Sequence, residues 1–141
     1  MSFTPAYRYI TGQELADLIK SDKKPLEDFA IVDVRDDDFL GGNIVGCLRY
    51  PSEKYESSIA ELIEKTKNVP KVIFHCALSQ QRGPKAARIY AEQCAAQNEG
   101  AKTEKEVLVL RGGFTEFQSA FKNDPKLVEK WRKEVWGSAW Y

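Results

Sequence analysis

The chain has 141 residues, of which 43% are hydrophobic and 30% charged, a composition typical of one soluble globular domain. Lysine and arginine together number 21, as do aspartate and glutamate, so no net charge draws the chain to nucleic acid or to a membrane. One histidine and three cysteines show neither a zinc-ligand spacing nor a disulfide framework, so we expect no metal site.

The N-terminal sequence lacks the basic and apolar regions of a secretory signal, and no apolar run approaches the ~20 residues of a membrane span. The few scattered cysteines favour a reducing environment. We therefore expect a cytoplasmic protein, with the nucleus as an additional compartment.

Segments typical of strands and of helices alternate along the chain. Thr11 and Glu14 are spaced as in a capping box and predict a helix over 12–20. Apolar runs predict strands at 6–10, 29–34, 47–50, 71–75 and 106–110. Helical spacing predicts further helices at 59–66, 83–97, 114–121 and 125–136, the first of them capped by Ser57 or Ser58. This alternation is typical of a mostly parallel sheet covered on both faces, hence of a three-layer α/β/α domain.

The loop between the strand at 71–75 and the helix at 83–97 combines several features of an anion site. Ligands bind beyond the carboxyl ends of the strands of an open parallel sheet, and Cys76 stands at such an end. The backbone N–H groups of a tight loop and of a first helical turn attract anions. Gly83 permits a close backbone approach there.

The residue types in this loop suit attack by sulfur on an oxyanion. A thiol titrates near ~8.5, but at about 3.5–7.5 when it lies at a helix N-terminus beside arginine or lysine. Arg82 can give two parallel hydrogen bonds to a phosphate-like group. A buried cysteine is more often a small hydrophobic residue. We favour a catalytic loop because His75, a strand and a Gly-Pro helix start accompany Cys76.

Three motifs resemble those of a known family. The stretch HCALSQQR at 75–82 resembles the HC-x5-R signature loop of cysteine-based protein tyrosine phosphatases. IVDVRDDDFLGGNIVGC at 31–47 is similar to the first conserved element of the rhodanese fold, and VLRGGFTEF at 109–117 to its last glycine turn. Together they resemble the rhodanese-fold phosphatases related to the mitotic-inducer dual-specificity phosphatases and to eukaryotic arsenate reductases. The resemblance implies a single rhodanese-like α/β/α domain over residues 1–141.

The resemblance also implies roles for individual residues. Cys76 would be the nucleophile and Arg82 the clamp on the oxyanion. His75 would orient the loop and support the thiolate, and the hydroxyl of Ser79 would donate to the thiolate or the anion. The backbone amides that would bind the oxyanion belong to Ala77, Leu78, Ser79, Gln80, Gln81 and Arg82. Asp33 and Arg35 would form an internal ion pair that braces the sheet near this loop.

The sequence departs from the mitotic enzymes in the loop and around it. No acidic residue lies between Cys76 and Arg82, and the run at 36–38 is interpreted as a solvated turn. Val34 takes the place of the cysteine that can protect the nucleophile in that branch. We interpret Cys94 and Cys47 as structural residues.

Loop length distinguishes the activities within the family. Sulfurtransferases have a loop one residue shorter, so the resemblance favours a tetrahedral oxyanion over sulfane sulfur. We expect a tyrosine or dual-specificity phosphatase without a cofactor, acting on a phosphorylated protein or a small aryl phosphate. The alternatives are an arsenate reductase, with glutathione as co-substrate and glutaredoxin as partner, and a rhodanese-like binding module without catalysis.

Overall fold

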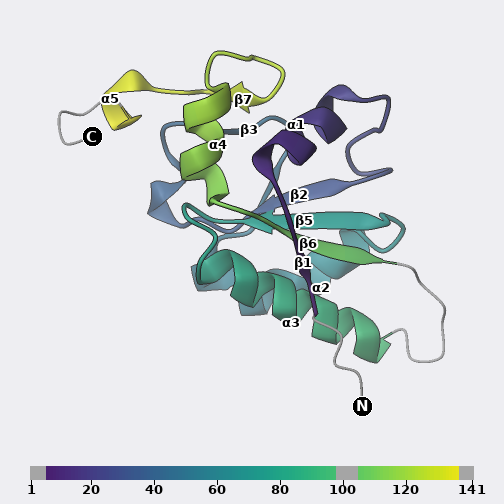
Figure 1. The fold of residues 1–141 in the computed structure, drawn as a ribbon. Helices are drawn as coiled ribbons and strands as arrows, with labels where there is room; N and C mark the ends of the chain where they lie inside the picture. Colours follow the sequence, from purple (N-terminus) through teal and green to yellow (C-terminus); the bar gives the residue numbers. More distant parts are fainter. Residues whose placement is uncertain (1–5, 98–104, 137–141) are drawn as a thin grey trace.

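A five-stranded sheet in the order β1-β6-β5-β2-β4 forms the centre of the molecule (Figure 1). The computed structural model describes residues 6–97 and 105–136. The strands of this sheet are β1 (Arg8–Ile10), β2 (Ala30–Asp33), β4 (Leu48–Arg49), β5 (Lys71–His75) and β6 (Glu106–Leu110). Every neighbouring pair runs parallel, which confirms the prediction and places the carboxyl ends of all five strands at one edge.

Helices cover both faces of this sheet, as Figure 1 shows. The helices are α1 (Gly12–Lys20), α2 (Tyr55–Lys65), α3 (Arg82–Gln97), α4 (Gly113–Phe121) and α5 (Lys133–Trp136). One core contains side chains of α2 and α3, and the other contains side chains of α1 and α4. Side chains of β5 alternate between them, since Val72 and Phe74 join the first core and Ile73 the second. The predicted three-layer architecture is confirmed.

The capping box predicted at the start of α1 is present. The backbone N–H of Glu14 donates to Thr11 Oγ1 at 3.1 Å, and the backbone N–H of Thr11 donates to Glu14 Oε1 at 2.9 Å. These two bonds satisfy donors that a helix start otherwise leaves free, so the helix begins where the sequence predicts.

The predicted start of the second helix is wrong. A 3-10 turn (Ser52–Lys54) leads directly into α2 at Tyr55, upstream of the expected serine caps. The Tyr55 side chain is buried, and its hydroxyl donates to the carbonyl of Ala86 in α3 at 2.8 Å. This contact between two helices extends α2 by a turn that local sequence signals do not indicate.

The single helix predicted over 125–136 is also wrong. Val128–Glu129 forms β7, which pairs antiparallel with β3 (Asn43–Ile44), and only α5 at the end is helical. Lys130 has a φ of 59°, which a continuous helix does not allow. Pairing with a strand more than eighty residues away therefore overrides the helical spacing of the apolar side chains.

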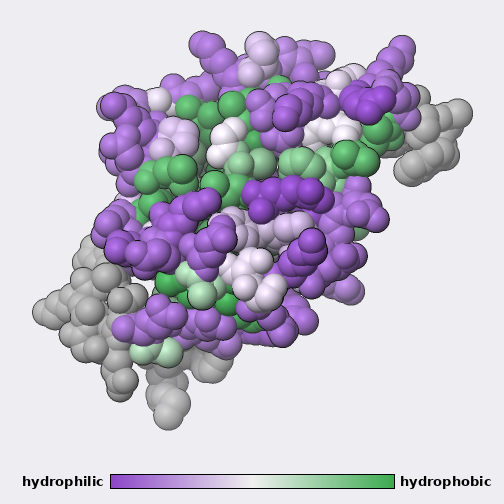
Figure 2. Space-filling view, turned by 180° about the vertical axis from the view of Figure 1, so that it is seen from behind, coloured by the Kyte–Doolittle hydropathy of each residue, from purple (hydrophilic) through white to green (hydrophobic). Residues whose placement is uncertain are grey.

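One face of the molecule is largely polar. Figure 2 shows a face on which hydrophilic side chains predominate, with hydrophobic side chains in smaller areas among them. Of the helices in the described part of the chain, none is long and apolar enough to cross a membrane.

Candidate active site

The chain wraps around the sulfur of Cys76 at the carboxyl end of β5. The backbone N–H of Ser79 lies 3.2 Å from Cys76 Sγ, and that of Gly83, in the first turn of α3, lies 3.3 Å from it. Ser79 has a φ of 55°, which is uncommon for a residue with a side chain and allows the loop to turn back. Two backbone donors therefore face the sulfur, as the stabilisation of a negative charge on it requires.

Gly83 allows this approach because it has no side chain. A Cβ atom at this position would lie 3.3 Å from both the backbone nitrogen of Cys76 and the Cα of His75. Such contacts are tighter than ordinary van der Waals packing, and both partners are backbone atoms that cannot rotate away. The close approach predicted for Gly83 is therefore present.

The loop encloses a hollow of about 350 Å³. The residues that line it are Cys76, Ala77, Leu78, Gln80, Gln81 and Arg82. The structure thus brings together at one hollow the cysteine, the arginine and most of the loop residues predicted from the sequence. Ser79 differs from the expectation: its Oγ lies 3.5 Å from the backbone nitrogen of Cys76, and its amide rather than its hydroxyl faces the sulfur.

Helix α4 also fixes the start of the loop. The sequence did not indicate that this helix contributes to the site. The backbone N–H of Phe114 donates to the carbonyl of Cys76 at 3.0 Å, and that of Thr115 donates to the carbonyl of Ala77 at 3.0 Å. These donors belong to the first turn of α4, whose free N–H groups need partners. The paired glycines at the start of α4 were the signal for this contact, because Gly113 has a φ of 61° and packs against the loop.

His75 acts on the backbone of Cys76 rather than on its sulfur. Its Nδ1 lies 3.2 Å from the Cys76 carbonyl oxygen, and its ring stacks on Phe114 in the core of α1 and α4. Cys76 joins the opposite core, as expected for consecutive residues at the end of a strand. Burial lowers the pKa of His75 below its ordinary value despite the nearby Asp33, so the ring is neutral at neutral pH. The expected orienting role fits this position, but direct support of the thiolate does not.

Asp33 and Arg35 form the predicted ion pair, and both side chains are fully buried. Arg35 Nη2 lies 2.7 Å from Asp33 Oδ2, and Arg35 Nε lies 3.1 Å from each carboxylate oxygen. Arg35 also donates to the backbone carbonyls of Gly42 and Asp38, at 2.9 and 3.2 Å. The pair therefore fixes the loop that follows β2 as well as the end of the sheet.

Asp37 and Asp38 are exposed, as the interpretation of residues 36–38 as a solvated turn implies, but two of the three aspartates also pair with Arg82. Arg82 Nη1 lies 2.9 Å from Asp38 Oδ1, and Arg82 Nη2 lies 2.6 Å from Asp38 Oδ2. Asp36 Oδ2 lies 3.4 Å from Arg82 Nη1. The hydrogen bonds from Arg82 hold the pKa of the Asp38 carboxyl below its usual range. Arg82 is therefore paired with a carboxylate from another loop, a contact that the sequence of residues 75–82 does not indicate.

The other two cysteines are placed as structural residues. Cys47 packs against the core of α1 and α4, on the opposite face of the sheet from Cys76. Cys94 is buried in α3, twelve residues beyond Arg82, which corresponds to ~18 Å along the helix. In this arrangement neither thiol is positioned to form a disulfide with Cys76.

Selective alkylation tests this distinction between the thiols. Burial raises the pKa of Cys47 to about 12 and that of Cys94 above its ordinary value, so both remain protonated at pH 8. We expect iodoacetamide to label Cys76 at least ten times faster than either of them, measured by mass spectrometry of the three peptides. Faster labelling of Cys47 would contradict the placement of the reactive thiol in the loop.

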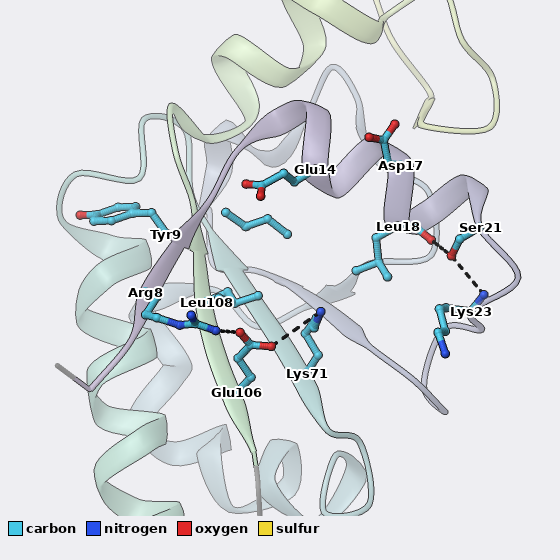
Figure 3. Close-up of a pocket in the computed structure, with 11 residues that line it drawn as sticks. Arg8, Tyr9, Glu14, Asp17, Leu18, Ser21, Lys23, Lys71, Glu106 and Leu108 are labelled. Carbon is cyan, nitrogen blue, oxygen red and sulfur yellow. Dashed lines mark hydrogen bonds and ion pairs between the residues drawn. The ribbon is translucent and has the colours of Figure 1, made fainter. Parts of the chain in front are cut away.

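A hollow larger than the one at Cys76 lies elsewhere on the described surface. It measures about 490 Å³ and lies beside α1 and the first residues of β5 and β6, at the opposite end of the sheet from Cys76 (Figure 3). Glu106 pairs there with Arg8 and Lys71. No cysteine or histidine lines it. No cluster of three potential metal ligands occurs within residues 6–97 and 105–136.

Comparison with known proteins identifies the family of the chain. Residues 11–120 match the model of the rhodanese-like domain. The chain is 32% identical over 123 residues to the dual specificity phosphatase Cdc25 of Arabidopsis thaliana, covering 86% of this chain and 80% of that protein. It is 31% identical over 107 residues to arsenate reductase 2.2 of Oryza sativa subsp. japonica, covering 75% and 78%.

A solved structure extends the likeness to the fold. The crystal structure of Saccharomyces cerevisiae Ygr203w, described as a homolog of single-domain rhodanese and of the Cdc25 phosphatase catalytic domain, superposes with a TM-score of 0.80. It is 28% identical and covers 95% of this chain and 94% of its own. The chain therefore belongs to the rhodanese-like domain family and has Cdc25-like phosphatases and arsenate reductases among its relatives.

Proposed function

We propose that this protein is a cysteine-dependent phosphatase that hydrolyses phosphate monoesters of a protein or a small aryl phosphate through a phosphorylated Cys76. The observation that supports this most strongly is the position of Cys76 Sγ, which faces two backbone N–H groups in a hollow that Arg82 also lines. A sulfur that reacts with a tetrahedral oxyanion needs such donors around it.

The reaction proceeds in two displacements at phosphorus. The thiolate of Cys76 attacks, the sulfur–phosphorus bond forms, and the bond from phosphorus to the ester oxygen breaks. Water then attacks the phosphorus, the sulfur–phosphorus bond breaks, and inorganic phosphate leaves with the thiolate restored. The loop amides and Arg82 stabilise the negative charge of the phosphoryl oxygens during both steps.

The ester oxygen leaves without an evident proton donor in the loop. The residues between Cys76 and Arg82 contain no acid, and Asp38 is ionised because Arg82 lowers its pKa. A general acid contributes about 10²–10⁴-fold, and a phenol needs this help less than an aliphatic alcohol. We therefore expect phosphotyrosine to be hydrolysed faster than phosphothreonine.

Reduction of arsenate is the second candidate activity. Cys76 would displace an oxygen of arsenate to form a sulfur–arsenic bond. Glutathione would then attack Cys76 Sγ, so that arsenite leaves with two electrons and a mixed disulfide remains for a glutaredoxin to reduce. The position of Cys47 across the sheet and of Cys94 along α3 favours an external thiol, because neither is positioned to resolve the adduct.

Turnover of three substrates by one preparation tests the proposal. Phosphotyrosine, phosphothreonine and arsenate with glutathione and glutaredoxin are compared for the wild type and for Arg82→Lys, which keeps the charge but loses the planar pair of donors. We expect phosphotyrosine to be the better ester and Arg82→Lys to lower its kcat/KM at least tenfold. Arsenite production without ester hydrolysis would favour the reductase, and no turnover of any substrate would favour a binding module.

A further inference from the structure

Arg82 is held from one side only. Asp38 binds the end of its guanidinium, where Nη1 and Nη2 donate to separate carboxylate oxygens at 2.9 and 2.6 Å. A guanidinium has a second pair of parallel donors along the side formed by Nε and Nη2. Within the described residues no acceptor lies at hydrogen-bond distance of Arg82 Nε. One side of the fork is therefore occupied by a carboxylate, and the other remains available.

The carboxylate of Asp38 is itself held in place. The backbone N–H of Asp36 donates to Asp38 Oδ1 at 2.9 Å, and the backbone carbonyl of Asp38 accepts a hydrogen bond from Arg35. Arg35 is in turn locked in the buried pair with Asp33. A continuous set of hydrogen bonds thus joins the buried ion pair at the end of β2 to the arginine of the loop.

Asp36 anchors the same segment to the 3-10 turn that precedes α2. Its Oδ2 accepts from the hydroxyl of Ser52 at 2.6 Å, and its Oδ1 accepts from the backbone N–H of Glu53 at 3.0 Å. The shortest distance from Asp36 to Arg82 is 3.4 Å, so the shorter hydrogen bonds of Asp36 are those that hold its own loop against Ser52 and Glu53. Asp38 is consequently the residue that binds the guanidinium, and Asp36 supports it.

Neither aspartate lines the hollow that the loop encloses, whereas Arg82 does. Both carboxylates therefore contact the guanidinium without occupying the position of a bound anion. A carboxylate inside the hollow would compete with an oxyanion for Arg82. A carboxylate that binds the guanidinium from outside the hollow would instead orient the arginine.

We propose that Asp38 is a positioning residue for the oxyanion clamp: it binds the end of the Arg82 guanidinium and leaves the Nε–Nη2 side free for an oxyanion in the hollow. This inference rests on the proposed oxyanion chemistry at Cys76. The expected consequence is that loss of the Asp38 charge weakens oxyanion binding, although it removes a negative charge from the neighbourhood of the anion. Simple electrostatics without positioning predicts the opposite change.

Protection of Cys76 against alkylation measures oxyanion binding without turnover. The rate of iodoacetamide labelling of the Cys76 peptide is followed against the concentration of inorganic phosphate, which gives a dissociation constant. The variants are Asp38→Asn, Arg82→Lys, the double variant, and Asp37→Asn as the matched control. Asp37 is an exposed neighbour whose side chain has no hydrogen bond or ion pair in the described part of the chain. Thermal unfolding confirms that each variant is folded, and Asp38→Ser replaces Asp38→Asn if the latter is not.

Asp38→Asn is expected to raise the dissociation constant for phosphate about tenfold, the scale of one charge-assisted hydrogen-bonded pair. Asp37→Asn is expected to change it less than twofold. In the Arg82→Lys protein, Asp38→Asn is expected to add less than twofold, because Asp38 acts through the arginine fork.

Three results would overturn the inference: tighter phosphate binding by Asp38→Asn, an equal effect of Asp38→Asn with and without Arg82, or no protection of the wild type by phosphate. The experiment distinguishes failure of the positioning role from failure of the proposed phosphatase function. Protection by phosphate with the expected variant effects, but without ester turnover, supports the positioning role and removes only the phosphatase reaction.

Discussion

Replacement of Cys76 by serine is expected to lower the turnover of an aryl phosphate at least ~10³-fold, because it removes the atom that attacks phosphorus. A serine hydroxyl is a far weaker nucleophile than a thiolate at neutral pH. The two N–H groups that face Cys76 Sγ, those of Ser79 and Gly83, stabilise an anion but do not deprotonate a hydroxyl. Steady-state rates with an aryl phosphate give the ratio.

Cys47→Ser is the matched control, because it removes a thiol of the same chain on the other face of the sheet. It is expected to retain activity within about twofold, with any loss explained by lower stability. The Cys76→Ser protein is also expected to bind inorganic phosphate, since the loop amides and Arg82 remain. Equal rates for Cys76→Ser and the wild type would rule out covalent catalysis at this residue.

The second large effect is expected for Gly113→Ala, at the junction of β6 and α4. A Cβ atom there would lie 2.3 Å from the carbonyl oxygen of Ala77 and 2.7 Å from that of Cys76, shorter than the non-bonded contacts that real Cβ atoms make. The residue also has a φ of 61°, which costs an alanine roughly 1 kcal/mol or more. We expect a loss of roughly 3 kcal/mol in the free energy of unfolding and at least tenfold in kcat/KM. Urea unfolding and steady-state kinetics measure the two effects.

Gly112→Ala is the matched control. It introduces backbone strain at the neighbouring residue without pushing on the loop that contains Cys76. Gly112 has a φ of 80°, but the atoms nearest to a Cβ there would be those at the carboxyl end of the Glu116 side chain, which can rotate away. This variant is expected to lose stability from strain while its kcat/KM stays within about threefold of the wild type. If both variants lost activity equally, the contact between α4 and the loop would not control the site.

Much of the fold could be predicted because its signals are local. Uninterrupted apolar runs identify β5 and β6, and the spacing of Thr11 and Glu14 identifies the start of α1. The errors occurred where distant contacts decide the structure. The hydroxyl of Tyr55 reaches across to α3, and residues 128–129 pair with β3, and neither partner is visible in the local sequence.

In the candidate site, too, local signals could be predicted from the sequence and distant contacts could not. The order of strand, cysteine, short loop and helix places Cys76 and Arg82 together, so the sequence was sufficient for them. Alternation along a strand could have shown that His75 faces away from the sulfur, and that pattern was not applied to it. The pair between Arg82 and Asp38 could not be predicted, since the two residues are 44 positions apart and only the parallel pairing of β2 with β5 brings their loops together.

The most direct measurement of the central claim is mass spectrometry of the Cys76 peptide after acid quenching during turnover of an aryl phosphate. A phosphoryl group on Cys76, present in the wild type and lost when the substrate is exhausted, is the result predicted for a cysteinyl-phosphate intermediate. Turnover that proceeds with an unmodified Cys76, or with the phosphoryl group on another residue, would contradict it.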